Sequence, residues 1–170
     1  LFIGDSITDM KWGRNEKDRN HYLGHSYVYL IASRLGVDMP EAQLEFFNRG
    51  HSGNRITDLR SRWKKDAIDM KPDLLSVLIG VNDRKVKKGA SFDPEKWGAD
   101  YRHILTSSRK VNPDLRIVLL DPFVLKTGWW MNKGGEWDAS RAQINQMRAV
   151  IAKLEKEFDA VRVPTQNVFD

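Results

Sequence analysis

Small polar residues follow three short apolar runs of the sequence. Gly-Asp-Ser occupies positions 4–6 after the first run, Asn-Arg-Gly positions 48–50 after the second, and Gly-Val-Asn-Asp positions 80–83 after the third. If these runs are strands of a parallel sheet, their carboxyl ends lie at one edge, where such sheets bind ligands. The three groups are therefore candidates for a single site, although each alone is also a common turn sequence.

Ser6 is the residue of this set that could act as a nucleophile. It stands where a strand gives way to a helix after a glycine, so we expect its hydroxyl to face outward. Three hydrogen-bond donors accompany it: its own N–H, the N–H of Gly50 and the side-chain amide of Asn82. Such donors stabilise the negatively charged oxygen of a tetrahedral intermediate. These residue types predict an acyl-transfer site that lacks only its base.

The three blocks, at positions 4–8, 48–54 and 80–83, resemble the first three blocks of the SGNH, or GDSL, hydrolase family. The order and spacing of the blocks also fit, and the resemblance covers essentially the whole chain. It implies a flavodoxin-like three-layer fold and the hydrolysis of esters, often acetyl or other short acyl esters. It also implies that Ser6 is the nucleophile, and that the N–H groups of Ser6 and Gly50 form the oxyanion hole with the Asn82 amide.

The last block of that family, Asp-x-x-His, which supplies the acid and the base, has no counterpart in the sequence. The final histidine is His103, and the pattern Asp-x-x-His occurs nowhere. We expect the block to lie beyond Asp170, which is not itself the aspartate of the block. On this interpretation, residues 1–170 are a single SGNH-type domain that is truncated at both ends.

The histidines differ in what their positions predict. His51 is adjacent to Gly50, and we expect it to contact the substrate; a plain loop histidine is the open alternative. His21 and His25 have the i, i+4 spacing of a metal-binding pair, but no third ligand is evident. We therefore predict no metal and no cofactor. His103 falls within an expected helix and is assigned no chemical role.

The segment 122–137 is long for a connection and rich in aromatic residues, and long loops in compact domains are often functional. Its aromatic side chains are Phe123, Trp129, Trp130 and Trp137. We expect Trp129 and Trp130 to contact the substrate, together with Asp5 beside the nucleophile. The rings would form an acyl pocket or a platform for a sugar, and packing against the body of the protein is the open alternative.

Two further patterns resemble the sites of other protein classes, and both fit those sites poorly. Residues 50–54, Gly-His-Ser-Gly-Asn, nearly spell the nucleophile elbow of α/β-hydrolases, but the fifth residue is not glycine. Because that fold also needs a downstream acid and then a histidine, we interpret Ser52 as a turn residue. The acids Asp5, Asp9 and Asp121 are of the kind found in a phospho-receiver pocket, but Ser6 and the other two blocks fit that pocket poorly.

Short apolar runs alternate along the chain with segments of helical periodicity. The expected strands are residues 1–4, 44–47, 74–79, 117–120 and 161–163. The expected helices are residues 26–35 with Gly36 as a stop signal, a helix from Thr57 or Asp58 to Pro72, a helix capped by Asp93 and ended by Pro113, and residues 140–158. This alternation predicts an α/β fold in which a central parallel sheet of about five strands carries helices on both faces.

The composition excludes several classes of protein. The chain has 170 residues, 28 Lys and Arg against 23 Asp and Glu, a formal net charge of +5, and no cysteine. Disulfides and cysteine nucleophiles are therefore absent, and the apolar runs are too short to cross a bilayer. The basic residues are spread along the chain without a nucleic-acid motif, which favours a solvated surface.

Together these patterns predict a serine esterase that acts on small acyl esters, such as the acetyl esters of a carbohydrate. The expected partner is a small-molecule or carbohydrate ester, and neither nucleic acid nor a membrane is expected. An SGNH-like carbohydrate-binding module without catalytic activity is the alternative, which the missing histidine motivates. The compartment and the oligomeric state are not indicated by the sequence.

Overall fold

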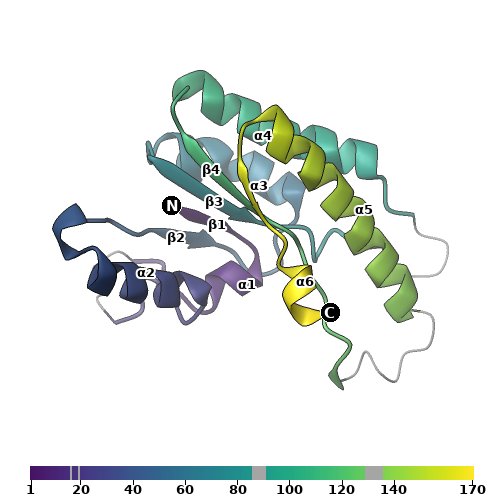
Figure 1. Ribbon diagram of the computed structural model, residues 1–170, viewed down its shortest axis with the longest axis horizontal. Coiled ribbons are helices and arrows are strands. Elements are labelled where there is room, and N and C mark those ends of the chain that lie inside the picture. The colour runs from purple at the N-terminus through teal and green to yellow at the C-terminus, as the bar shows by residue number, and fades with distance from the viewer. Residues whose placement is uncertain (16, 19, 86–90, 129–135) are drawn as a thin grey trace.

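The computed structural model describes residues 1–170 except 16, 19, 86–90 and 129–135. At the centre of this described part is a sheet of five parallel strands in the order β2-β1-β3-β4-β5 (Figure 1). The strands are β1 (Phe2–Gly4), β2 (Asn48–Gly50), β3 (Leu74–Leu78), β4 (Arg116–Leu120) and β5 (Val161–Val163). Gly4 at the end of β1 pairs with Gly50 of β2 and Leu78 of β3, so these three strands end side by side.

Helices connect the strands on both faces of the sheet (Figure 1). They are α1 (Ser6–Asp9), α2 (Tyr27–Asp38), α3 (Ile56–Trp63), α4 (Pro94–Val111), α5 (Glu136–Glu157) and α6 (Gln166–Phe169), with the 3-10 turn η1 (Pro40–Ala42) and the π-helical turn η2 (Lys64–Ile68), which continues α3. Figure 1 shows α2 on one face, and α3, α4 and α5 on the other. The predicted three-layer α/β fold is confirmed.

The two faces of the sheet are buried in separate clusters, because successive side chains of a strand point to opposite sides. Ile3 of β1 lies in the larger core, beneath α3, α4 and α5. The helical residues of this core include Leu59, Trp63, Tyr101, Ile104, Ile144, Met147 and Ile151. Phe2 points the other way and packs with Leu23 and with Val28 of α2. The apolar residues of α3, α4 and α5 therefore form the main core together with the strands.

The second strand lies later in the sequence than predicted. Residues 44–47 form no strand, whereas the polar residues 48–50, which were expected to follow the strand, are β2. A strand is defined by its partner, and β1 begins only at Phe2, which pairs with Asn48. The Phe2 N–H donates to the Phe47 carbonyl at 2.8 Å, so pairing begins directly after the apolar run.

Several helix boundaries also differ from the expectations. Gly36 does not stop α2, which continues to Asp38, and Leu30 on this helix is 66% exposed. The buried residue of α2 is Val28, because the helix contacts the sheet near its amino end. Helix α3 begins at Ile56, just before the predicted start, and α5 begins at Glu136 instead of residue 140.

Candidate active site

Ser6 lies at the first position of α1, directly beyond the end of β1. Asp5 caps this helix, because its Oδ1 accepts the N–H of Ile7 at 3.0 Å. The turn into the helix passes close to β3, so a Cβ on Gly4 would lie 2.3 Å from the carbonyl oxygen of Leu78. Among the described residues, neither the hydroxyl nor the N–H of Ser6 has a hydrogen-bond partner. The half-buried Ser6 therefore keeps both groups free for a ligand.

The loop that follows β2 is fastened to the same turn. His51 donates its N–H to the Gly4 carbonyl at 3.0 Å. Ser52 donates twice to Asp9 Oδ2, from its N–H at 2.8 Å and from its hydroxyl at 2.6 Å. Arg14 pairs with the same carboxylate oxygen at 2.6 Å. Since the Ser52 hydroxyl has an acceptor, its interpretation as a turn residue agrees with the geometry.

The N–H and the carbonyl of Gly50 are both hydrogen-bonded within the protein. Its N–H donates to Asn48 Oδ1 at 2.8 Å, so this predicted oxyanion donor already has an acceptor. Its carbonyl accepts from Trp12 Nε1 at 2.8 Å and from Arg14 Nη1 at 2.6 Å. A Cβ on Gly50 would lie 2.3 Å from the N atom of Asp9, which explains the need for glycine. The glycine permits the close approach of β2 to α1, and its N–H is not free to donate to an oxyanion.

Gly53 of this loop was not among the residues predicted from the sequence. It has a φ of +82°, a left-handed conformation that favours glycine, and its Cα faces open space. No acceptor for its N–H is found in the part of the chain that the structure describes. A second glycine three positions after Gly50 was the available signal, because a turn glycine can expose its N–H.

Asn82 follows β3 and reaches across to this loop. Its Nδ2 donates to the main-chain carbonyl of Asn54 at 3.0 Å. An amide nitrogen carries two hydrogens. One hydrogen therefore orients the Asn82 side chain, and the other is left to donate to a ligand. The structure thus connects the block around Gly53 with the block that contains Asn82.

Two buried carboxyl groups lie beneath these loops. Burial raises the pKa of Asp5 to about 6, against the lowering effect of its hydrogen bond from Ile7. Burial also raises the pKa of Asp83 to about 6, and the charge of Asp5 adds to that increase. Both oxygens of Asp83 accept the N–H of Ile56, at 3.2 and 3.3 Å. Asp5 is only 1% exposed and caps α1 through its Oδ1, and its contact with the substrate stays a prediction.

The remaining residues predicted to contact substrate have different outcomes. His51 is half-buried, and burial followed by the charges of Arg62 and Arg14 lowers the pKa of its imidazole. A neutral His51 can accept or donate a hydrogen bond, and its contact with substrate stays a prediction. Trp129 and Trp130 lie outside the described residues.

Two aromatic residues around that segment pack within the protein. Phe123 stacks on Phe169 of α6 with ring centroids 4.7 Å apart. The Nζ of Lys126 lies 5.9 Å from the ring centroid of Trp137. These contacts agree with the packing alternative for Phe123 and Trp137.

The possible metal pair also has local contacts. His21 Nδ1 lies 3.2 Å from Asp18 Oδ2, and the rings of His21 and His25 meet edge to face. Within the described ranges, no group of three or more histidine and acidic side chains is arranged to hold a metal ion.

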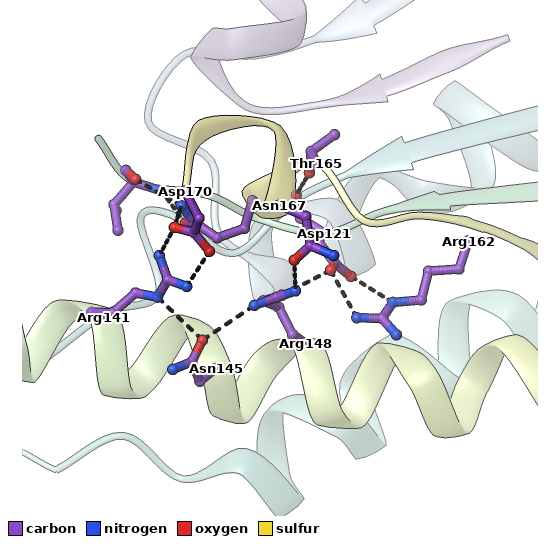
Figure 2. Close-up of polar contacts among 10 residues, drawn as sticks. Asp121, Arg141, Asn145, Arg148, Arg162, Thr165, Asn167 and Asp170 are labelled. Atoms are coloured by element: carbon purple, nitrogen blue, oxygen red, sulfur yellow. Dashed lines mark hydrogen bonds and ion pairs between the residues drawn. The ribbon is translucent and has the colours of Figure 1, made fainter. Parts of the chain in front are cut away.

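Asp121 belongs to a separate cluster at the ends of β4 and β5 (Figure 2). Its fully buried carboxylate accepts from Arg148 Nε at 2.9 Å, and from Arg162 Nε and Nη2 at 2.8 Å each. Its carbonyl accepts the hydroxyl of Thr165, which precedes α6. The cluster joins β4, β5, α5 and α6. The arginines that contact the Asp121 carboxylate come from α5 and β5. These contacts do not include Asp5 or Asp9, so they do not form a receiver pocket.

Comparison with known proteins places the whole chain in one family. A family model for the GDSL-like lipases and acylhydrolases matches residues 2–170. The chain belongs to the GDSL-like lipase/acylhydrolase family. This confirms the resemblance drawn from the three sequence blocks, and it makes the parallel α/β sheet the scaffold of a hydrolase.

Individual family members resemble the chain over nearly its full length. An acetylxylan esterase from Geobacillus stearothermophilus is 32% identical over 177 residues, which cover 100% of this chain and 77% of the relative. The crystal structure of that kind of enzyme, Axe2, superposes with a TM-score of 0.82 at 31% identity and covers 99% of this chain and 76% of the other. A GDSL-like lipase from Parabacteroides merdae gives a TM-score of 0.88 at 34% identity, with 98% of this chain and 77% of that one covered.

Structures of Axe2 variants identify catalytic residue types in that relative. Its catalytic mutants replace a serine, an aspartate or a histidine by alanine. The replaced aspartate and histidine are three positions apart in Axe2.

In the part of this chain that the structure describes, no helix is long and apolar enough to cross a membrane.

Proposed function

We propose that this protein is a serine esterase that hydrolyses acetyl or other short acyl esters carried by a carbohydrate. The observation that carries the proposal is that Ser6 has unpaired polar groups. Its hydroxyl and its N–H are both unpaired among the described residues, at the edge where β1, β2 and β3 end side by side. The family membership supports ester hydrolysis, and the acetylxylan esterase relative supports the acetylated carbohydrate.

In the proposed mechanism, Ser6 Oγ attacks the ester carbonyl while a base takes its proton. The N–H groups of Ser6 and Gly53 and the Asn82 amide donate to the oxyanion of the tetrahedral intermediate. The carbon–oxygen bond to the sugar then breaks, the sugar oxygen takes the proton, and an acyl-Ser6 intermediate remains. Water attacks this intermediate by the same route and releases acetate with the free serine.

The base is not assigned to any histidine of residues 1–170. His51 is the nearest to the loop of Gly53, but its own N–H and carbonyl fix that loop through Gly4 and Asn54. In Axe2 the catalytic set includes an aspartate and a histidine in addition to the serine. The expectation of an Asp-x-x-His block outside residues 1–170 therefore stays a prediction, which the sequence of the complete gene tests.

The substrate class is tested by measuring acetate release from acetylated xylo-oligosaccharides with the complete gene product. We expect turnover of these esters and of 4-nitrophenyl acetate, with a marked decline for acyl chains of eight or more carbons. Preference for the long acyl chains would contradict the proposed substrate class. Binding of acetylated oligosaccharide without any acetate release would favour the module that only binds carbohydrate.

A further inference from the structure

A single arginine of α3 contacts the ends of β1 and β2 and the loop that follows β2. Arg62 Nε donates to Asn54 Oδ1 at 2.8 Å, and its Nη1 donates to the carbonyl of Arg49 at 2.9 Å. Its Nη2 donates to the carbonyl of Gly4 at 3.3 Å, two residues before Ser6. The guanidinium thus bridges the turn that holds the nucleophile and the loop that holds Gly53.

Asn54 extends this connection to Asn82, the proposed oxyanion donor that follows β3. Its side-chain oxygen is fixed by Arg62, while its main-chain oxygen accepts the Nδ2 of Asn82 at 3.0 Å. Arg62 does not touch Asn82 in these contacts, so it acts on that amide through Asn54. The order of contact is therefore Arg62, Asn54, Asn82.

The burial of Arg62 is not explained by stability alone. Its side chain is 16% exposed, and its ion-pair partner Asp66, at 2.7 Å, is 12% exposed. Buried ion pairs contribute little to net stability compared with well-packed apolar residues, because both charges lose their hydration. What an apolar residue could not do is donate to the three acceptors at the strand ends. The rigid fork of donors is specific to arginine.

We propose that Arg62 is a positioning residue of the esterase, which holds Asn54 and thereby the Asn82 amide in the oxyanion hole. The inference rests on the proposed function of Ser6 and Asn82, and it adds a residue that contacts neither substrate nor nucleophile. The charge of Arg62 also reaches the site, since it is the second cause, after burial, that lowers the pKa of His51.

Arg109 provides a matched control at the opposite end of the sheet. It donates to the carbonyls of Pro113 at 2.7 Å, Leu115 at 2.6 Å and Phe158 at 2.6 Å. Leu115 and Phe158 precede β4 and β5, so this arginine also ties strand ends together, but away from Ser6. Lysine at either position retains the charge and loses the fork of donors.

The experiment compares Arg62→Lys with Arg109→Lys in the complete gene product, with 4-nitrophenyl acetate as substrate. We expect Arg62→Lys to lower kcat about tenfold with KM changed less than about twofold, because a misplaced donor weakens transition-state binding. Arg109→Lys is expected to change kcat less than about twofold. We expect the melting temperatures of Arg62→Lys and Arg109→Lys to fall by similar amounts. Equal losses of kcat in the two variants would overturn the proposal.

A double-mutant cycle tests whether Arg62 acts through Asn82. In an Asn82→Ala background, Arg62→Lys should lower kcat far less than about tenfold, since the amide that it positions is absent. An undiminished effect in that background would show that Arg62 acts by another route. If Arg62→Lys does not fold, Asn54→Ala carries the same test, because it removes only the Arg62 acceptor and keeps the carbonyl that orients Asn82.

A measurement without substrate separates this inference from the proposed function. The side-chain amide signals of Asn82 in a nitrogen-15 NMR spectrum, assigned with Asn82→Ala, should shift or broaden in Arg62→Lys and stay in place in Arg109→Lys. If the wild-type protein hydrolyses no ester, the proposed function fails. Unmoved signals would contradict the positioning of Asn82 by Arg62 whether or not the protein hydrolyses esters.

Discussion

The carboxyl ends of the strands carry two polar clusters, one at Asp121 and one at Ser6, and they differ in how completely their atoms are paired. Both oxygens of the Asp121 carboxylate accept hydrogen bonds from arginines, and its carbonyl accepts the Thr165 hydroxyl (Figure 2). At the other cluster, the hydroxyl of Ser6 and the N–H of Gly53 have no partner among the described residues.

The difference distinguishes polar groups that stabilise the fold from polar groups that are available to a ligand. Buried polar groups in native proteins are almost always hydrogen-bonded, since an unpaired group loses the free energy of hydration without compensation. The Asp121 cluster meets this requirement internally and has no carboxylate oxygen left for a ligand. The Ser6 cluster leaves donors and a hydroxyl unpaired at an edge of the sheet, which is the condition for binding a reacting ester.

The largest effect is expected from removing the unpaired hydroxyl. Ser6→Ala should lower kcat/KM for 4-nitrophenyl acetate by at least about 10⁴-fold, because no acyl-enzyme can form. Its melting temperature should stay close to that of the wild type, since the hydroxyl has no protein partner. Ser52→Ala is the control, and its loss should be less than about tenfold. A full loss of activity in Ser52→Ala together with retained activity in Ser6→Ala would make Ser52 the nucleophile and contradict the assignment of Ser6.

Removing an oxyanion donor should have the next largest effect. Asn82→Ala should lower kcat about 10²–10³-fold with little change in KM, because the amide interacts most strongly with the charged intermediate. Steady-state kinetics with 4-nitrophenyl acetate measure this effect. An unchanged kcat would remove Asn82 from the proposed oxyanion hole.

Removing the charge of the fully paired carboxylate should affect stability and not chemistry. Asp121→Asn should lower the free energy of unfolding in urea by about 3 kcal/mol, because two arginines lose their buried partner. The kcat of the folded protein at 25 °C should change less than about twofold. Arg141→Gln breaks the more exposed pair with Asp170 and should lower the free energy of unfolding much less than Asp121→Asn does, because solvent screens that pair. A large fall in kcat for Asp121→Asn would show that the Asp121 cluster also takes part in catalysis.

The smallest effect concerns the pH dependence of stability. The pKa of Asp83 is raised to about 6 by burial, so the folded state holds its proton more tightly than the unfolded chain, in which an aspartate titrates near 3.9. The resulting stabilisation is fully present below about pH 4 and is lost as the pH rises through about 6. Asp83→Asn should therefore gain stability relative to the wild type between pH 4 and pH 7, by on the order of 2 kcal/mol. Urea unfolding at these two pH values measures the gain, and an equal difference at both values would contradict it.

The sequence predicted the fold well because strand and helix periodicities are local signals. The helices α3, α4 and α5 were predicted from their helical periodicity, and Asp93 was predicted to cap α4, as it does. The position of β2 was wrong, because a run of apolar residues does not show where the neighbouring strand begins. That boundary is set by the pairing of Phe2 with Asn48, which is a contact between distant parts of the chain.

The residue types of the site are local signals in the sequence, whereas their hydrogen-bond partners are not. The blocks around Ser6 and Asn82 were found from residue type and order, and the structure brings the loops that carry them together. The choice between Gly50 and Gly53 depends on which N–H already has an acceptor, and only coordinates show the bond from Gly50 to Asn48. The role of Arg62 also depends on contacts across two strands and could not be read from its place in α3.

The central claim, that Ser6 is the nucleophile, is tested most directly by labelling the complete gene product with a fluorophosphonate. In this reaction the serine oxygen bonds to phosphorus and fluoride leaves, so mass spectrometry of peptides locates the attacking residue. We predict one adduct, on the peptide that contains Ser6, which is absent in Ser6→Ala and retained in Ser52→Ala. An adduct on Ser52, or no adduct in a folded wild-type protein, would contradict the claim.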